Sequence, residues 1–520
     1  MQHLRCTVSA ARSSRSAALV ETKSAADSLA ESICSPLTNR DAPLGRRFAL
    51  AAVIATLLLA IDLAKAGHGR LDVALTATAL DFRVVYCGAE ALRTGKDPYT
   101  VEPLRSCEHR VGREPGEPEW AVTPLPLPGY AIALFVPLSL LPFVAAKALW
   151  VWLLVLGFAL ASACIAATAR APTLAVAAVF APTIGFGINL HYGEPVPLAI
   201  AALCAAALAL ERKAYRSAAA LTVVASIEPH VALPAILALG LLVPRARLPL
   251  AVALPAAGAL SLATLGFARN LEYFTTLLPL HAQSELLARD QLGLSRFLAL
   301  AGMPARSSLL LGTLCYSATT AFGIVAARRL SARLALPGLI VLFPPAAAML
   351  GGTFVHDVQI AAALPAAVLL APYVRTARVA IALLVVDWTA SWRDQVFPAL
   401  VGTLGAAVVA FPVQRRRWIP WAGEATLFTM LLLAALARVP DRQVGVDSVR
   451  AQAAAIAPPG AIERLTPHDP ASRAWALRIA VEPGWKEITL GDVADKAPLW
   501  IALVLLIAAA GTGERRRAAA

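Results

Sequence analysis

Charged side chains are scarce in this 520-residue chain, at 15% of all residues, whereas a soluble globular protein has roughly 25%. Hydrophobic residues make up 58% of the chain and the mean hydropathy is +0.67. This scarcity of charge argues against a soluble fold. A regular alternation of polar and apolar residues is also missing, which argues against a transmembrane β-barrel. Instead, continuous runs of Ala, Leu and Val recur from residue 47 to the end, as in transmembrane helices.

The spacing of Cys and His that marks a metal site is absent too, so we expect neither a metal ion nor a cofactor. Three of the seven cysteines, Cys164, Cys204 and Cys315, lie within apolar runs, where cysteine is usually a small core residue. Cys87 and Cys107 fall in one loop that we place outside the cytoplasm. An oxidising compartment would allow them to form a disulfide, or they remain free thiols.

The net charge of +13 would suit a nucleic-acid-binding protein, but its distribution argues against that partner. The arginines stand in short clusters between apolar runs, which is typical of cytoplasmic loops. A smaller basic group at residues 211–216 does not fit, because counting the crossings places it on the outer side. The clusters that fit are Arg245 and Arg247; Arg328, Arg329 and Arg333; Arg375 and Arg378; Arg415 to Arg417; and Arg515 to Arg517.

These patterns predict an all-α polytopic membrane protein with about 12–14 transmembrane helices and both termini inside. Residues 1–45 are expected to be a disordered cytoplasmic tail. Residues 46–438 form the transmembrane core, whose first outer loop is 67–123. A second outer segment spans 268–304, residues 439–497 form an extracytoplasmic segment, and 498–520 are the last helix with a basic tail. Glu228-Pro229 interrupts the apolar run 215–243 and predicts a broken helix there.

The first predicted outer loop holds the densest group of ionisable residues in the chain. Asp81 begins a stretch of helical character, where an acidic residue is favoured by the helix dipole. The sequence Gly-Lys-Asp-Pro-Tyr at 95–99 reads as the turn that ends this helix. Without further context, Asp81 is better explained as a helix N-cap, and it is the motif around it that favours a functional role.

Two patterns in this loop resemble glycosyltransferase family 87, the bacterial mannosyltransferases that depend on polyprenol-phosphate-mannose. They are Asp-Phe-Arg-Val-Val-Tyr at 81–86 and Gly-Lys-Asp-Pro-Tyr at 95–99. Three weaker similarities follow in the order that the family has them. They are the Pro-rich residues 124–142 with Ala146 and Trp150, then Tyr-Gly-Glu-Pro at 192–195, then Gly-Thr-Phe-Val-His-Asp at 352–357.

The resemblance implies a C-type glycosyltransferase fold, with Asp81 as catalytic base and a polyprenyl-phosphate sugar as donor. The implied reaction transfers a sugar, by family default mannose, to a lipid or glycan acceptor. It would take place on the extracytoplasmic side of the bacterial cytoplasmic (inner) membrane, in which the multi-pass chain lies. A polar sugar cannot enter hydrocarbon and its lipid tail cannot leave it, so we expect the chemistry at the interface.

We expect an inverting mechanism in which Asp81 accepts the proton of the attacking hydroxyl. The leaving lipid phosphate needs cations at its oxygens, for which arginine is well suited. His356 would orient the acceptor or contact the phosphate, and Tyr86 and Tyr99 would pack a sugar face or only pack the loop. The candidates for the phosphate contacts are Arg83, Lys96 and Arg269.

Glu228 and His230 form a possible further site. Many family members have Lys-Pro where this chain has Glu228-Pro229. An ionisable residue at membrane depth is by default a functional hypothesis. The alternative is that the broken helix exposes both side chains to water.

Other functions stay open at this stage. A transporter or flippase of lipid-linked saccharides would favour paired charges deep in several helices and an internal repeat, and the chain has no recognisable repeat. A polymerase or ligase of surface polysaccharide would place its chemistry in a larger late outer loop. A non-catalytic member of the enzyme family is the third alternative.

Overall fold

The computed structural model describes residues 43–66, 79, 81–112, 117–181, 192–288, 291–390, 443, 445–482 and 490–512. The predicted tail before residue 43 and the predicted spans 395–413 and 418–438 lie outside these residues. Within them all regular structure is helical and no strand forms, which confirms the predicted all-α class. Three helical segments are long and apolar enough to cross a membrane: Phe143–Thr168, Pro244–Leu287 and Ala305–Leu334.

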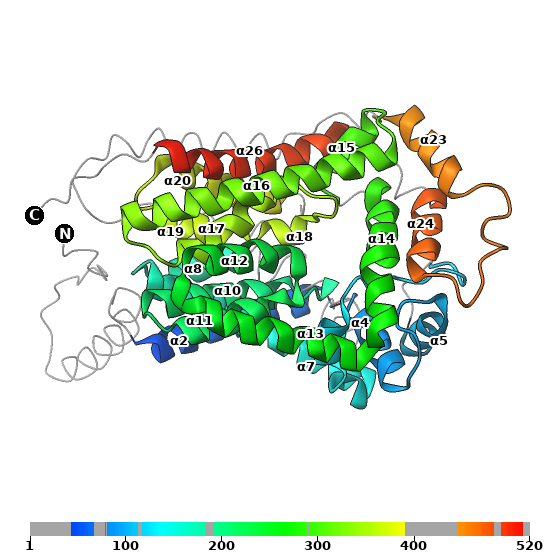
Figure 1. The fold of residues 1–520 in the computed structure, drawn as a ribbon, viewed down its shortest axis with the longest axis horizontal. Helices are drawn as coiled ribbons and strands as arrows, with labels where there is room; N and C mark the ends of the chain where they lie inside the picture. Colours follow the sequence, from blue (N-terminus) through cyan, green and yellow to red (C-terminus); the bar gives the residue numbers. More distant parts are fainter. Residues whose placement is uncertain are drawn as a thin grey trace, which may run out of the picture.

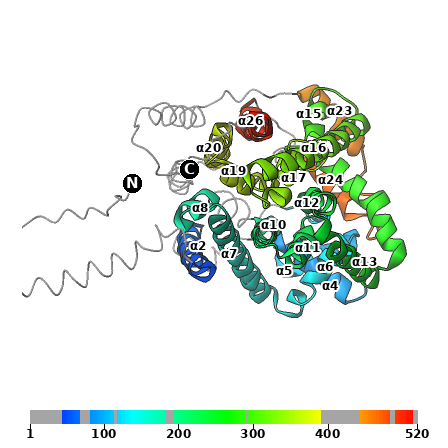
Figure 2. The same cartoon turned by 60° about the vertical axis from the view of Figure 1, so that its left-hand side comes forward.

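Two groups of helices pack side by side in the main body (Figures 1 and 2). The first group is α2 (Leu44–Ala66), α7 (Phe143–Thr168), α8 (Thr173–Phe180), α10 (Val196–Glu211), α11 (Tyr215–Val224), α12 (Pro229–Leu242) and α13 (Pro244–Glu272). The second group is α16 (Ala305–Leu334), α17 (Leu339–Ala348), α19 (Ala363–Leu370), α20 (Arg375–Ala390) and α26 (Leu490–Thr512). Helix α17 joins the groups, because it packs against α10 and α12 of the first and against α16 and α19 of the second.

The long helices differ in what surrounds them. The apolar window of α7 is 67% buried, whereas the windows in α13 and α16 are only 11% and 22% buried. Large apolar side chains such as Leu248, Val252 and Leu314 are therefore exposed along α13 and α16. Exposed apolar surface of this extent is unfavourable in water and suits contact with lipid.

Helices α7 and α10 approach each other closely at a glycine. A Cβ atom at Gly157 of α7 would lie 2.7 Å from a methyl carbon of Leu198 in α10. Small residues at a helix crossing allow the backbones to come close, and this is how helices associate without a hydrophobic driving force from water. This contact holds the middle of α7 against α10.

The sequence predicted one helix break correctly and missed another. The broken helix at Glu228-Pro229 is confirmed: α11 ends at Val224, a 3-10 turn covers Ala225–Ile227, and α12 begins at Pro229. The run 127–143, by contrast, is not one helix. It holds the seven-residue α6 (Gly129–Phe135) and a 3-10 turn, because prolines at 137 and 142 lack the N–H that would continue a helix.

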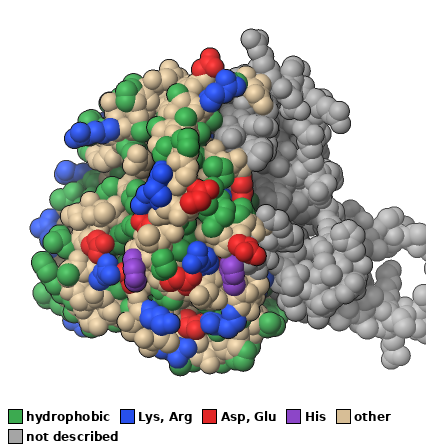
Figure 3. Space-filling model, turned by 90° about the vertical axis from the view of Figure 1, so that its right-hand side faces the viewer, with side chains coloured by type: hydrophobic (Ala, Val, Ile, Leu, Met, Phe, Trp, Pro, Cys, Tyr) green, Lys and Arg blue, Asp and Glu red, His purple; other side chains and the backbone are tan. Residues whose placement is uncertain are grey.

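Five short helices gather at one end of the bundle, on the right of Figure 1. They are α4 (Phe82–Arg93), α5 (Val101–Val111), α14 (Leu278–Ser284), α23 (Val446–Ile456) and α24 (Ala471–Val481). They belong to three segments that the sequence places on the outer side, namely 67–123, 268–304 and 439–497. Figure 3 looks onto this end and shows acidic, basic and histidine side chains gathered there.

The basic clusters of α13 and α16 lie at the opposite end. Helix α13 has 29 residues and ends beside α14, so its first turn, with Arg245 and Arg247, is remote from that end (Figure 1). Helix α16 has 30 residues and starts after α15 (Leu294–Leu300), so Arg333 in its last turn is also remote. The separation agrees with the positive-inside interpretation. Which end faces the cytoplasm stays a prediction.

Candidate functional site

Asp81 stands immediately before the first residue of α4, half-buried, where the chain meets residues 192–195. Its backbone N–H donates a hydrogen bond of 2.6 Å to the carbonyl of Tyr192, and its own carbonyl accepts from the N–H of Val84 at 3.0 Å. Its side chain makes no capping hydrogen bond to α4. The geometry therefore does not support the plain N-cap explanation of this residue.

Three of the sequence patterns converge beside Asp81. The ring of Phe82 stacks on that of Trp150, with 5.6 Å between centroids, and on that of Phe143 at 6.1 Å. The indole Nε1 of Trp150 donates to the carbonyl of Gly193 at 2.7 Å. Gly193 has a positive φ of 78°, and a Cβ there would lie 2.7 Å from that of Ala79. Only glycine fits this approach of two backbones.

The two predicted tyrosines both use their hydroxyl groups within the protein. Tyr86 donates to the carbonyl of Leu141 at 2.9 Å, and Tyr99 donates to the carbonyl of Leu127 at 2.8 Å. Both rings are buried, and Tyr99 lies 5.5 Å from the ring of Tyr273. These contacts pack the loop against the residues before α6 and α7.

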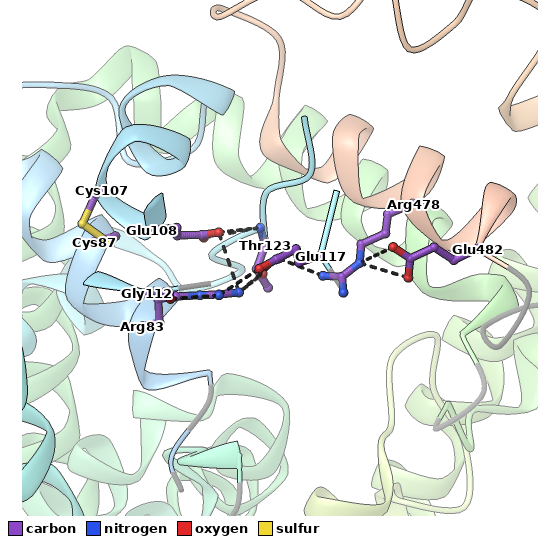
Figure 4. Close-up of polar contacts among 9 residues, drawn as sticks. All are labelled: Arg83, Cys87, Cys107, Glu108, Gly112, Glu117, Thr123, Arg478 and Glu482. Carbon is purple, nitrogen blue, oxygen red and sulfur yellow. Dashed lines mark hydrogen bonds and ion pairs between the residues drawn. A yellow bond between two sulfur atoms is a disulfide. The ribbon is translucent and has the colours of Figure 1, made fainter. Parts of the chain in front are cut away.

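Arg83 points away from any open surface into a buried ionic network (Figure 4). Its two terminal nitrogens lie 2.9 and 3.2 Å from the carboxylate oxygens of Glu117. The same carboxylate accepts from Arg478 of α24 at 3.0 Å, and Arg478 also pairs with Glu482 at 3.1 Å. The side chains of Arg83, Glu117 and Arg478 are 6%, 1% and 7% exposed. We refer to Arg83, Glu117 and Arg478 as the ionic triad.

Glu108 of α5 lies beside the ionic triad, with a carboxylate oxygen 3.8 Å from Arg83. Burial raises the pKa of Glu108 to about 8, although the positive charge of Arg83 opposes the shift. The pKa of this carboxyl in the folded protein thus lies above its ordinary value of 4.5. The folded state holds this proton more tightly than the unfolded chain. Stability from Glu108 is therefore complete below pH 4.5 and is lost as the pH rises through 8.

The disulfide that the sequence allowed is formed between Cys87 and Cys107 and ties α4 to α5. The segment before α24 is also tied to this loop, by extended backbone pairing around Thr100 and Pro470. Three backbone hydrogen bonds of 2.8–2.9 Å make the pairing: Val101 N–H to Asp469 O, Glu102 N–H to Pro467 O, and Ala471 N–H to Tyr99 O. Residues some 370 positions apart in the chain therefore form one unit.

A hollow of about 520 Å³ opens between this unit and the end of α13. Three predicted residues, Lys96, Tyr99 and Arg269, line it together with side chains that include Glu102 and His468. We refer to it as the outer hollow. Lys96 is exposed to solvent. Asp81 does not belong to its lining, so the predicted base and the predicted cations do not meet in this hollow.

The charge of Arg269 is compensated inside the outer hollow. One of its terminal nitrogens lies 2.5 Å from a carboxylate oxygen of Asp97, and the other lies 2.5 Å from one of Glu272. Asp97 also accepts from the backbone N–H of Tyr99 at 3.0 Å, which fixes the turn that follows α4. Arg269 thus links the end of α13 to the first loop.

Two predicted residues, His230 and His356, meet around Phe354 together with His281, which was not predicted. The centroid of the Phe354 ring lies 5.6 Å from that of His230, 4.8 Å from that of His281 and 4.5 Å from that of His356. His281 is 5% exposed, and neither of its ring nitrogens has a hydrogen-bond partner among the described residues. We refer to these three imidazoles and Phe354 as the histidine cluster.

Two buried carboxylates flank the histidine cluster. An oxygen of Glu228 lies 2.8 Å from Nε2 of His230, and an oxygen of Glu285 lies 3.4 Å from Nε2 of His356. Glu285 also accepts a hydrogen bond from the indole of Trp475 in α24. Glu228 is 4% exposed, so the broken helix does not turn its carboxylate out to bulk water.

The loop that carries Phe354 and His356 is fastened to its surroundings by the backbone. Leu292 N–H donates to the carbonyl of Val355 at 2.6 Å, and the side chain of Gln291 accepts from Val355 N–H at 2.7 Å. A Cβ at Gly351 would lie 2.5 Å from the backbone nitrogen of Tyr316 in α16. The glycine therefore allows the loop to lie directly on that helix.

A cavity of about 10 Å³ lies between the two groups, lined by Tyr99, Tyr273, Leu277 and His281 among others. It has room for about one water molecule. Since Tyr99 and Leu277 also line the outer hollow, the hollow and the histidine cluster are neighbours. Across the described residues, no three His, Cys, Asp or Glu side chains converge as metal ligands would.

Comparison with known families and curated proteins identifies no relative of this chain. No family model matches the chain, and no curated protein matches it either. The resemblance to glycosyltransferase family 87 stays a prediction that rests on the motifs.

Several residues of these sites could not be singled out from the sequence. Glu117 and Arg478 stand in polar segments with no pattern around them, although opposite charges in two outer segments were a weak signal. His281 and His468 were isolated histidines in such segments. Their importance follows from neighbours that lie far away in the chain.

Proposed function

We propose that this chain is a polytopic membrane glycosyltransferase that transfers a sugar from a polyprenyl-phosphate donor to an extracytoplasmic lipid or glycan acceptor. Mannose is the first sugar to test. The observation that carries the proposal is the convergence of three separated sequence patterns at Asp81. Its backbone N–H binds Tyr192, while the neighbouring Phe82 stacks on Trp150, which in turn binds Gly193.

The surroundings of the bundle support a membrane location. The apolar faces of α13 and α16 are exposed over long stretches, and the ionisable side chains gather at one end of these helices (Figure 3). A lipid-linked sugar needs both environments at once, because its tail partitions into hydrocarbon and its sugar stays in water. Asp81 begins a helix at the charged end.

The proposed reaction is a single displacement with inversion. The oxygen of an acceptor hydroxyl attacks the anomeric carbon of the donor sugar, and the bond from that carbon to the phosphate oxygen breaks. The lipid phosphate leaves with the electron pair, and the Asp81 carboxylate takes the proton of the hydroxyl. Atoms and charges balance, and no oxidant or reductant is needed.

The cations available for the departing phosphate are fewer than the sequence predicted. Arg83 is committed to the ionic triad and Arg269 to two carboxylates. Lys96 is exposed to solvent, but it lies beyond the far end of the 12-residue α4, roughly 18 Å of helix from Asp81, and lines the outer hollow.

A transfer assay tests the proposal directly. The full chain, purified into lipid nanodiscs, is given polyprenyl-phosphate mannose, the corresponding glucose donor and a nucleotide-linked mannose, with a mannoside acceptor. We expect transfer from a polyprenyl-phosphate donor, none from the nucleotide donor, and a product anomer opposite to that of the donor by NMR. Transfer from the nucleotide sugar alone, or a product with retained configuration, would contradict the mechanism.

A transporter of lipid-linked saccharides is a second candidate, favoured by one observation. Buried carboxylate–imidazole pairs such as Glu228 with His230 are groups that can carry protons through a membrane protein. In that case proteoliposomes would move a fluorescent lipid-linked saccharide between leaflets without changing it. Glu228→Gln would abolish this movement.

A further inference from the structure

The outer hollow has the size of a ligand site and a wall from the C-terminal segment. Its volume of about 520 Å³ lies within the range of roughly 300–1,000 Å³ found for small-molecule sites. One side comes from the first loop, with Lys96 and Glu102, and another from the end of α13, with Arg269. His468 and Pro470 form a third side. The segment 466–471, which pairs with the first loop, therefore contributes one wall of the hollow.

The charges in the outer hollow do not suit an anionic ligand. Acidic residues of the lining, Asp97, Glu102 and Glu272, outnumber the basic ones, Lys96 and Arg269. The guanidinium of Arg269 is already held by two carboxylates at 2.5 Å each. Glu102 is likewise paired with Arg105 at 2.8 Å. A phosphate entering here would have to displace one of these ion pairs, which is unfavourable.

The same lining suits hydroxyl groups. Carboxylates accept strong hydrogen bonds, and the lining adds hydroxyls from Thr100 and Ser106 and the imidazole of His468, which can donate and accept. The short apolar surfaces of Pro103 and Pro470 lie among these polar groups. A sugar ring presents the matching surface, because its hydroxyls point outward around a compact carbon skeleton.

We propose that the outer hollow, between the first loop and the segment 466–471, is a binding site for an uncharged, hydroxyl-rich saccharide: a sugar unit of the acceptor glycan that is remote from the hydroxyl reacting at Asp81. This rests on the proposed function, since it names the chemical class of the acceptor. Of the three residues that the sequence predicted as phosphate contacts, Lys96 and Arg269 line this hollow and Arg83 does not. His468 is the residue of the C-terminal segment that contacts this saccharide.

The test measures saccharide binding by the full chain in nanodiscs, using saturation-transfer NMR. The neutral probe is methyl α-mannopyranoside and the anionic probe is mannose 6-phosphate. We expect saturation transfer to the neutral probe, with an affinity that changes less than about twofold between low and high salt. His468→Ala and Glu102→Gln should each weaken binding about tenfold, as the loss of one hydrogen bond would. Lys96→Gln should change it less than about twofold.

Arg450→Gln is the matched control, because Arg450 is an exposed residue of α23 with only a 4.0 Å ion pair to Asp447. It should leave binding unchanged. Tighter, salt-dependent binding of mannose 6-phosphate that is lost in Lys96→Gln would overturn the proposal. So would a neutral probe that gives no signal, or one whose signal is unaffected by both His468→Ala and Glu102→Gln.

Transfer kinetics separate this inference from the proposed function. A His468→Ala variant with the acceptor KM of the wild type would overturn the acceptor site while the glycosyltransferase proposal stands. Saccharide binding without any transfer in the wild type would remove the acceptor role and the proposed function, and would leave only a saccharide-binding hollow. A raised acceptor KM with unchanged donor KM in His468→Ala supports both.

Discussion

The ionic triad offers a sharp test of how the C-terminal segment is held, through the substitution Glu117→Gln. Glu117 supplies the one carboxylate that lies between the guanidinium groups of Arg83 and Arg478, at 2.9 and 3.0 Å (Figure 4). The amide of glutamine has nearly the same shape but no charge. The substitution therefore leaves two buried cations facing a neutral group.

The expected cost follows from burial. All three side chains are at most 7% exposed, so solvent screens their charges little. Removing one partner of a buried ion pair costs about 3–5 kcal/mol. Glu482 remains 3.1 Å from Arg478 and offsets part of this, which favours the lower figure. At 1.4 kcal/mol per tenfold, about 3 kcal/mol is roughly a 100-fold rise in the opening equilibrium of the docked segment.

Hydrogen–deuterium exchange of the full chain in detergent measures this opening. Amides of α24 and the paired residues 467–471 should exchange roughly 100-fold faster in Glu117→Gln, while those of α7 should not change. Glu119→Gln is the matched control, because Glu119 is two positions away and exposed. Adding Arg478→Gln to Glu117→Gln should recover part of the protection, since it removes one of the two buried cations that face the neutral amide.

Protection of α24 that differs from wild type by less than about threefold in Glu117→Gln would refute the reasoning. Equal losses in Glu117→Gln and Glu119→Gln would also do so. In either case the docking would rest on the backbone pairing and on the apolar contacts of Trp475.

Three further predictions follow from the same end of the molecule. Thermal stability of the wild type should fall between pH 5 and pH 9, because the folded state favours protonated Glu108 with its pKa near 8; Glu108→Gln should flatten this fall in differential scanning fluorimetry. Cys87→Ser should lower stability by about 3 kcal/mol, since the disulfide closes a loop with a sequence separation of 20; reducing agent should then destabilise the wild type alone. Gly351→Ala should displace the loop of the histidine cluster, because its Cβ would lie 2.5 Å from Tyr316 N; altered NMR signals of the cluster histidines would report this, and unchanged ones would contradict it.

Local patterns in the sequence predicted much of the fold. Glu228-Pro229 marked the helix break, because proline removes a backbone donor wherever it stands. The long apolar runs marked helices such as α7, α13 and α16. Arginine clusters and polar segments sorted to opposite ends of the bundle. The prediction of one helix over 127–143 was wrong. The run is apolar, but the positions of its prolines limit where a helix can form, and hydropathy does not record them.

The candidate site was harder to predict from the sequence, because its residues are joined by contacts between distant parts of the chain. Arg83 has the sequence context of a phosphate ligand, but a carboxylate in its own loop and an arginine 395 positions further on decide its environment. His468 stands in a segment without a pattern, and only the pairing of Thr100 with Pro470 brings it to the outer hollow. Such neighbours depend on the packed fold.

The most direct test of the account is the rate of sugar transfer in Asp81→Asn. Single-turnover transfer from polyprenyl-phosphate mannose should fall by about 10²–10⁴-fold, the usual contribution of a general base, while donor binding stays within about twofold of wild type. Asp447→Asn, at a fully exposed carboxylate of α23, should transfer at the wild-type rate. An Asp81→Asn protein that transfers as fast as the wild type would contradict the central claim that this carboxylate takes the acceptor's proton.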